Sequence, residues 1–99
     1  MAQILVDRYV IETLMRDLIQ HDKRPSAFVV YLYLWHRTLG EARPSVHQSH
    51  QQLADATGLS KSAVQSAIRT LVRRRLVRAR RASPTATPEY FLHRPWAED

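Results

Sequence analysis

The segment from His50 to Arg69 constrains the fold more than any other part of the chain. Its sequence, HQQLADATGLSKSAVQSAIR, contains two short helical patterns separated by only a few residues. Two short helices joined this closely must cross at a steep angle. Gly58 supplies the positive φ that a tight turn between them requires. We therefore expect helices over residues 49–57 and 60–75, with the turn at Gly58.

Each of these helices begins with a serine, Ser49 or Ser60, whose side chain can cap it. Ala54 is small enough to lie where the second helix crosses the first, and Val64 can pack back against it. The apolar residues that we assign to the inner side of the motif are Leu53, Ala54, Ala56, Leu59, Val64, Ala67, Ile68, Leu71 and Val72.

The period of the apolar residues changes after Arg75. Residues 76–80 have the composition of a strand, and residues 83–88 contain two prolines that indicate a turn. Residues 89–93 include Tyr90, Phe91 and Leu92 and suit a returning strand. We expect the two strands to pair as a hairpin over residues 76–94.

Residues 8–20 precede the motif and carry apolar side chains at helical spacing, with Asp7 at the N-cap position. The helix is expected to bury one stripe, formed by Val10, Ile11, Leu14, Met15, Leu18 and Ile19. Residues 41–48 are expected to be a connection, with a short extended piece at 44–47.

Residues 26–39 are ambiguous. Their β-branched and aromatic residues favour a strand, whereas the Pro25-Ser26 start, the length and Gly40 as a stop favour a helix. We expect a largely buried helix. Its aromatic residues, Tyr31, Tyr33 and Trp35, are then core or interface groups.

The basic residues are concentrated in one third of the chain, which has 99 residues and a net charge of +6. Residues 1–55 hold six acidic and six basic side chains, whereas residues 56–88 hold eight basic side chains and no acidic one. Positive charge concentrated in this way indicates a polyanionic partner, because contacts with its phosphates release bound counterions. A solvated basic face is the alternative.

The run LADATGLSKSAVQSAIRTLVRRRLV closely resembles the helix-turn-helix of bacterial and phage proteins and the start of a wing. It is similar to winged-helix transcription regulators and replication initiators, and the resemblance covers roughly residues 45–94. It implies a mainly α fold with a small β-hairpin, the winged helix-turn-helix, preceded by N-terminal helices. The sequence departs from many relatives at Arg75, where they have glycine.

The resemblance implies that the second helix enters the major groove of double-stranded DNA. In that setting Gln65 would bind an adenine edge and Arg69 a guanine edge, while Lys61 and the nearby serine hydroxyls would hold phosphate. The wing arginines would contact the backbone or the minor groove. The expected DNA-binding residues are Lys61, Ser62, Gln65, Ser66, Arg69, Arg73, Arg74, Arg78, Arg80 and Arg81.

Other functions find little support in the sequence. It has no cysteine, no glycine-rich phosphate loop and no motif that frames a nucleophile. His47 and His50 have metal-like spacing, but no third ligand joins them, so a surface role is the better interpretation. We expect no catalytic residue, no metal and no cofactor.

The chain is expected to form a single domain over residues 1–99 and a homodimer through its N-terminal helices, residues 8–39. The first apolar run is interrupted by Asp7 and Arg8, which disfavours a signal peptide, and no run is long enough to cross a bilayer. We therefore expect a cytoplasmic, sequence-specific DNA-binding regulator. The alternatives are a plasmid or phage replication or partition factor, and a winged-helix module that binds protein.

Overall fold

The computed structural model describes residues 2–97. The elements in chain order are two π-helical segments, η1 (Val10–Leu14) and η2 (Asp17–His21), then α1 (Pro25–Arg37), a 3-10 turn η3 (Leu39–Glu41), β1 (Val46–His47), α2 (His50–Thr57), α3 (Lys61–Arg73), β2 (Val77–Arg80) and β3 (Glu89–Leu92). The architecture is mainly α with a small antiparallel sheet, which confirms the expected winged-helix fold.

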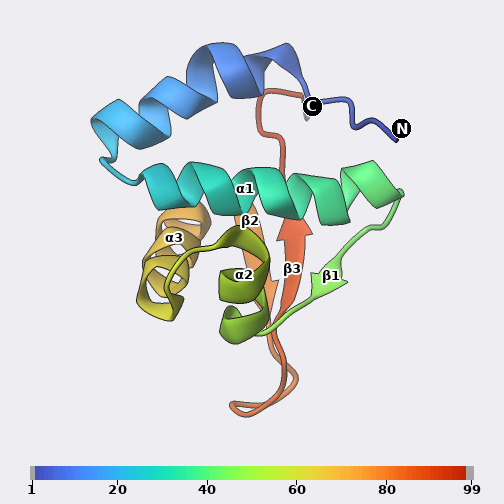
Figure 1. The fold of residues 1–99 in the computed structure, drawn as a ribbon. Coiled ribbons are helices and arrows are strands. Elements are labelled where there is room, and N and C mark those ends of the chain that lie inside the picture. The colour runs from blue at the N-terminus through green and yellow to red at the C-terminus, as the bar shows by residue number, and fades with distance from the viewer. Residues whose placement is uncertain (1, 98–99) are drawn as a thin grey trace.

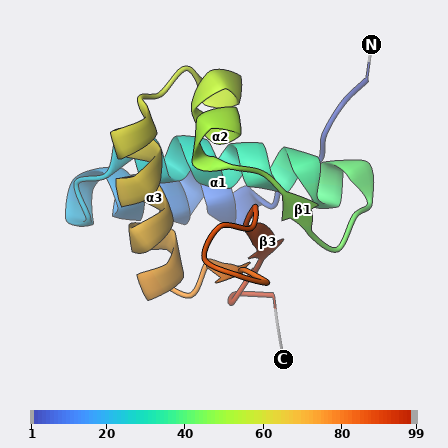
Figure 2. The same cartoon turned by 90° about the horizontal axis from the view of Figure 1, so that it is seen from below.

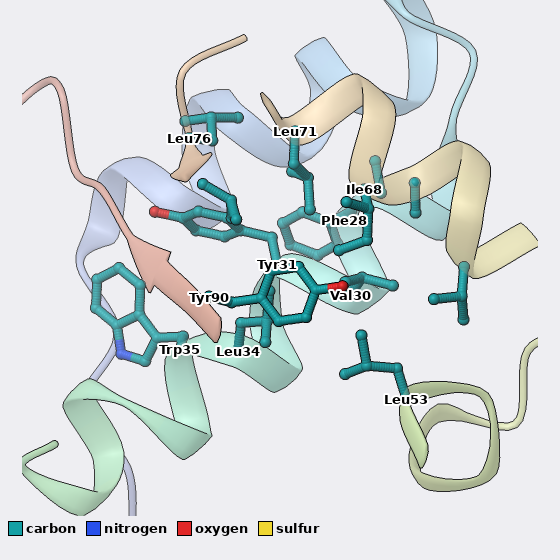
Figure 3. Packing of buried hydrophobic residues seen from close by; sticks show 14 of the residues in the cluster. Phe28, Val30, Tyr31, Leu34, Trp35, Leu53, Ile68, Leu71, Leu76 and Tyr90 are labelled. Carbon is teal, nitrogen blue, oxygen red and sulfur yellow. The ribbon is translucent and has the colours of Figure 1, made fainter. Parts of the chain in front are cut away.

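Helix α1 crosses the middle of the molecule (Figure 1). The N-terminal helical segment lies on one side of it, and α2, α3 and the sheet lie on the other. Because it is covered on both sides, α1 is largely buried, as its apolar sequence predicts. Figure 3 shows Phe28, Tyr31, Leu34 and Trp35 of this helix in one buried cluster with Tyr90 of β3 and Leu71 of α3.

The polar ends of two buried aromatic side chains of α1 are hydrogen-bonded. The Tyr31 hydroxyl donates to the carbonyl of His93 at 2.8 Å, and the Trp35 indole Nε1 donates to the carbonyl of Leu5 at 2.9 Å. Large rings can therefore be buried here without leaving a donor unpaired. These two bonds tie both ends of the chain to α1.

The helix-turn-helix lies where the sequence places it. Ser49 and Gln52 form a capping box, in which Gln52 N donates to Ser49 Oγ at 3.0 Å and Ser49 N donates to Gln52 Oε1 at 2.8 Å. Gly58 ends α2 with φ at +79°, and Ser60 Oγ accepts from Ala63 N at the start of α3. Two inner assignments are wrong, since Ala56 and Val72 are exposed.

Helix α3 ends at Arg73, two residues earlier than predicted. The end is a Schellman motif, in which Arg75 N donates to Val72 O and Leu76 N donates to Leu71 O. Arg75 takes the left-handed position with φ at +59°. The turn into β2 is therefore made with an arginine in a conformation that favours glycine, under backbone strain.

The first predicted helix is helical over residues 8–21, but most of it has π-type hydrogen bonds, such as Asp22 N to Asp17 O at 3.0 Å. Only Val10, Leu14 and Leu18 are fully buried, because the segment lies along one side of α1 as an outer layer. The predicted stripe was therefore too wide.

The structure gives more detail at two predicted helix boundaries. Asp7 directly precedes the first helical residue, as predicted, and its carboxylate accepts from Arg94 Nη1 and Trp96 Nε1. Helix α1 ends at Arg37 with Thr38 as its C-cap, so Gly40 is not its stop. The left-handed residue that closes the following turn is Ala42, with φ at +54°.

The sheet has three strands in the order β1-β3-β2, all antiparallel. The predicted hairpin is present, with Val77 opposite Leu92 and Arg80 opposite Glu89. The short extended piece before α2 adds a strand that the sequence did not predict, with Val46 opposite Tyr90. The sheet therefore joins the wing to the residues that lead into α2.

Candidate nucleic-acid interface

One side of α3 presents the five polar residues predicted for the second helix. Lys61, Ser62 and Arg69 are exposed, and Gln65 and Ser66 are half-buried. The opposite side of the helix packs into the core through its apolar residues, which are Val64, Ala67, Ile68 and Leu71. The helical period thus separates a packing face from a polar face, as the sequence predicts.

Two of the exposed groups on α3 are held by neighbours on the same face. Arg69 Nη2 donates to Ser66 Oγ at 3.2 Å, and the hydroxyls of Ser60 and Ser62 lie 3.2 Å apart. These bonds are exposed and local, so a polyanion can replace them at little cost. They hold the side chains on the polar face in the absence of a ligand.

A groove runs between α3 and the wing. It consists of two adjoining hollows of about 440 and 370 Å³, which share His50, Gln65, Arg81 and Pro88. Arg69 lines the first hollow and Lys61 lines the second. Figure 2 shows α2, α3 and the loop between β2 and β3 on the same side of the molecule. We call this feature the interface groove.

Arg81 connects the wing to the interface groove. Its Nη1 donates to the carbonyl of Ala86 across the wing turn at 3.0 Å. The same side chain lines both hollows, so the bond within the wing also positions a positive charge in the groove. Of the predicted wing arginines, Arg81 is the one that the structure brings together with the polar face of α3.

Arg78 and Arg80 lie on the opposite face of the sheet. Ala79 lines the interface groove, and side chains alternate along a strand, so its two neighbours point away from the groove. The guanidinium carbon of Arg78 lies 4.3 Å from the centre of the Phe91 ring. Arg80 Nε lies 4.0 Å from Glu89 Oε1, so part of its charge is offset.

Arg74 is turned toward the N-terminal helical segment. Its Nη1 lies 2.6 Å from Asp22 Oδ1, and its Nη2 lies 3.9 Å from Asp17 Oδ2. Arg73 is exposed and lines the same hollow as these two aspartates, away from the interface groove. Neither arginine lines the interface groove with Lys61, Gln65 and Arg69.

His50 is the interface residue that the sequence did not identify. It is the first residue of α2, it is half-buried, and it lines both hollows of the groove. Burial lowers the pKa of His50, and the positive charges of Arg81 and Lys61 lower it further. No local pattern marks this position, because the groove forms only when the wing folds back beside α2.

Within residues 2–97, no helix is long and apolar enough to span a membrane. The same residues contain no group of three or more histidine, aspartate or glutamate side chains that could hold a metal ion.

Comparison with known proteins identifies a family. The model of the MarR family matches residues 33–86, which is more than half of the chain and runs from the middle of α1 into the wing turn. No curated protein and no solved structure matched. The matched segment contains α2, α3 and most of the interface groove. The chain belongs to the MarR family, whose members are winged-helix transcription regulators that bind DNA.

Proposed function

We propose that this regulator binds specific double-stranded DNA with the N-terminal half of α3 in the major groove and with the wing on the backbone or in the minor groove. The observation that carries the proposal is the interface groove, where Lys61, Arg69 and Arg81 converge from α3 and the wing. No carboxylate is among the described residues that line the two hollows. A groove of this charge attracts the DNA backbone.

The roles on α3 follow from reach and chemistry. Gln65 can donate to and accept from an adenine edge, and Arg69 can donate twice to guanine. Lys61, Ser62 and Ser66 suit phosphate, which fixes the register of the protein on the duplex. Arg81 would add a backbone contact from the wing. Arg73, Arg74, Arg78 and Arg80 act at longer range, since they lie outside the groove.

We further propose a homodimer formed through the N-terminal helical segment, within a single domain over residues 1–99. Members of the MarR family usually dimerise. On this segment Tyr9, Ile11 and Ile19 stay exposed after folding. A two-fold symmetric dimer would present two copies of α3 to the two half-sites of a palindrome.

A salt titration with a random-sequence duplex tests DNA binding directly. Three cations in the groove predict a slope of log affinity against log salt of about −3 or steeper. Replacing Lys61 or Arg81 with alanine should reduce the slope by about one. The proposal is wrong if the protein shows no measurable binding at low salt.

A further inference from the structure

His50 occupies a position in the interface groove that the proposed contacts do not use. It is one of four residues common to both hollows, so it lies where the space beside α3 meets the space beside the wing. Its side chain is half-buried rather than free in solvent. A ligand that fills the groove must therefore contact it or displace it.

The groups around His50 carry positive charge. Lys61 and Arg69 face the groove from α3, Arg81 faces it from the wing, and the buried Tyr90 lines it from β3. No acidic side chain among the described residues lines either hollow. Without a ligand, burial and the charges of Arg81 and Lys61 keep the pKa of His50 below its ordinary value, so the imidazole is neutral near pH 7.

A DNA backbone phosphate in the groove would instead favour the charged form of His50. A phosphate between Lys61 and Arg81 offsets the two charges that disfavour the imidazolium, and it accepts a hydrogen bond from it. We propose that His50 is a further DNA-contacting residue, which binds a backbone phosphate as the imidazolium and takes up one proton as DNA enters the groove. The inference rests on the proposed DNA-binding mode.

The sign of the pH dependence follows from linkage. The pKa of His50 is lowered in the free protein and is higher in the complex, so the added binding energy is fully present below the free-state pKa. It is lost as the pH rises through the higher pKa of the complex. Affinity for DNA should therefore fall between mildly acidic and mildly alkaline pH.

The test measures the Kd for a random-sequence duplex at constant ionic strength from about pH 5.5 to pH 8. The wild type should lose about tenfold more affinity over this range than His50→Gln, because one coupled proton changes binding by up to about tenfold per pH unit. His21→Gln is the matched control, since His21 lies in η2 and lines the hollow of Asp17 and Asp22, which is outside the interface groove. It should behave as the wild type does.

His50→Arg supplies a second variant with a permanent charge. This variant should bind DNA at pH 8 about as tightly as the wild type binds at pH 5.5. Its affinity should lack the pH dependence that His50 gives to the wild type. Superimposable pH profiles for the wild type, His50→Gln and His50→Arg, all with measurable binding, would overturn the role of His50 and leave the proposed function intact. Absence of binding at every pH would instead overturn both.

Discussion

At the scale of single residues, two arginines near the C-terminal end of α3 illustrate how position decides the role of an arginine. Arg69 lies on the polar face of α3 and lines the interface groove, whereas Arg74, five residues later, pairs with Asp22. Arg80 and Arg81 are adjacent in sequence, yet only Arg81 lines the groove. The distribution of charge along the sequence does not distinguish these four arginines.

These placements predict different effects of alanine substitutions on DNA binding. Arg69→Ala should weaken a selected site by about tenfold or more and random DNA by less, since a bidentate base contact contributes about 1–3 kcal/mol of discrimination. Arg81→Ala should weaken both by a similar factor. Arg80→Ala is the control on the opposite sheet face and should have the smallest effect. Competition titrations with both duplexes measure all three. If Arg69→Ala weakens binding to both duplexes equally, Arg69 does not contact a base.

At the scale of elements, the ion pair between α3 and the N-terminal segment links two layers of the fold. The Asp22 side chain is only 5% exposed and that of Arg74 is 31% exposed. Their shortest N–O distance is 2.6 Å, so the contact is a charge-assisted hydrogen bond in a sheltered place. It fixes the C-terminal end of α3 to the corner between η2 and α1.

Arg74→Ala should therefore destabilise the protein by about 2 kcal/mol, because it leaves the carboxylate of Asp22 without its guanidinium partner. The neighbouring exposed change Arg73→Ala should cost less than about 0.5 kcal/mol. Urea unfolding followed by circular dichroism compares the two. If Arg73→Ala proves as costly as Arg74→Ala, the ion pair is not the source of the loss.

The elements also separate what the sequence can predict from what it cannot. The capping serines, Gly58 and the polar face of α3 depend on neighbours within one or two turns, so local rules predict them. The pairing of β1 with β3 and that of Arg74 with Asp22 join residues far apart in the chain. Such contacts depend on how the layers pack, and no local pattern encodes that packing.

The turn at Arg75 combines a feature that the sequence predicts with one that depends on packing. The resemblance marked the position as one that favours glycine, and the structure gives it a positive φ. Arginine is accepted there because the backbone bonds around the turn and the burial of Leu76 hold the conformation. The turn into β2 is thus made by an arginine with a positive φ.

At the scale of the whole molecule, the two sides of α1 differ in chemistry. The interface groove is on one side, and the exposed apolar residues of the N-terminal segment are on the other (Figure 1). Ile11 and Ile19 remain 48% and 42% exposed. Large apolar side chains that stay exposed on this side suit an interface with another protein surface.

A dimer predicts two linked observations. Light scattering at micromolar concentration should give twice the mass of the 11.5 kDa chain, and sequences selected from a random duplex library should contain two-fold related half-sites. Ile11→Asp with Ile19→Asp should yield a folded monomer with weaker binding to the selected site. A monomeric mass for the unaltered protein would refute the dimer and leave the groove proposal standing.

Strand β1, which adds a third strand to the sheet, affects how tightly such a protein can bind DNA. β1 pairs with β3 at the root of the wing, Gln48 N donates to Pro88 O at 3.1 Å, and the next two residues are the cap and first residue of α2. The root of the wing and the start of α2 are therefore one hydrogen-bonded unit. Folding has already removed most of the conformational freedom of that unit, so little remains to be lost when DNA fills the groove. The groove is preorganised for its ligand.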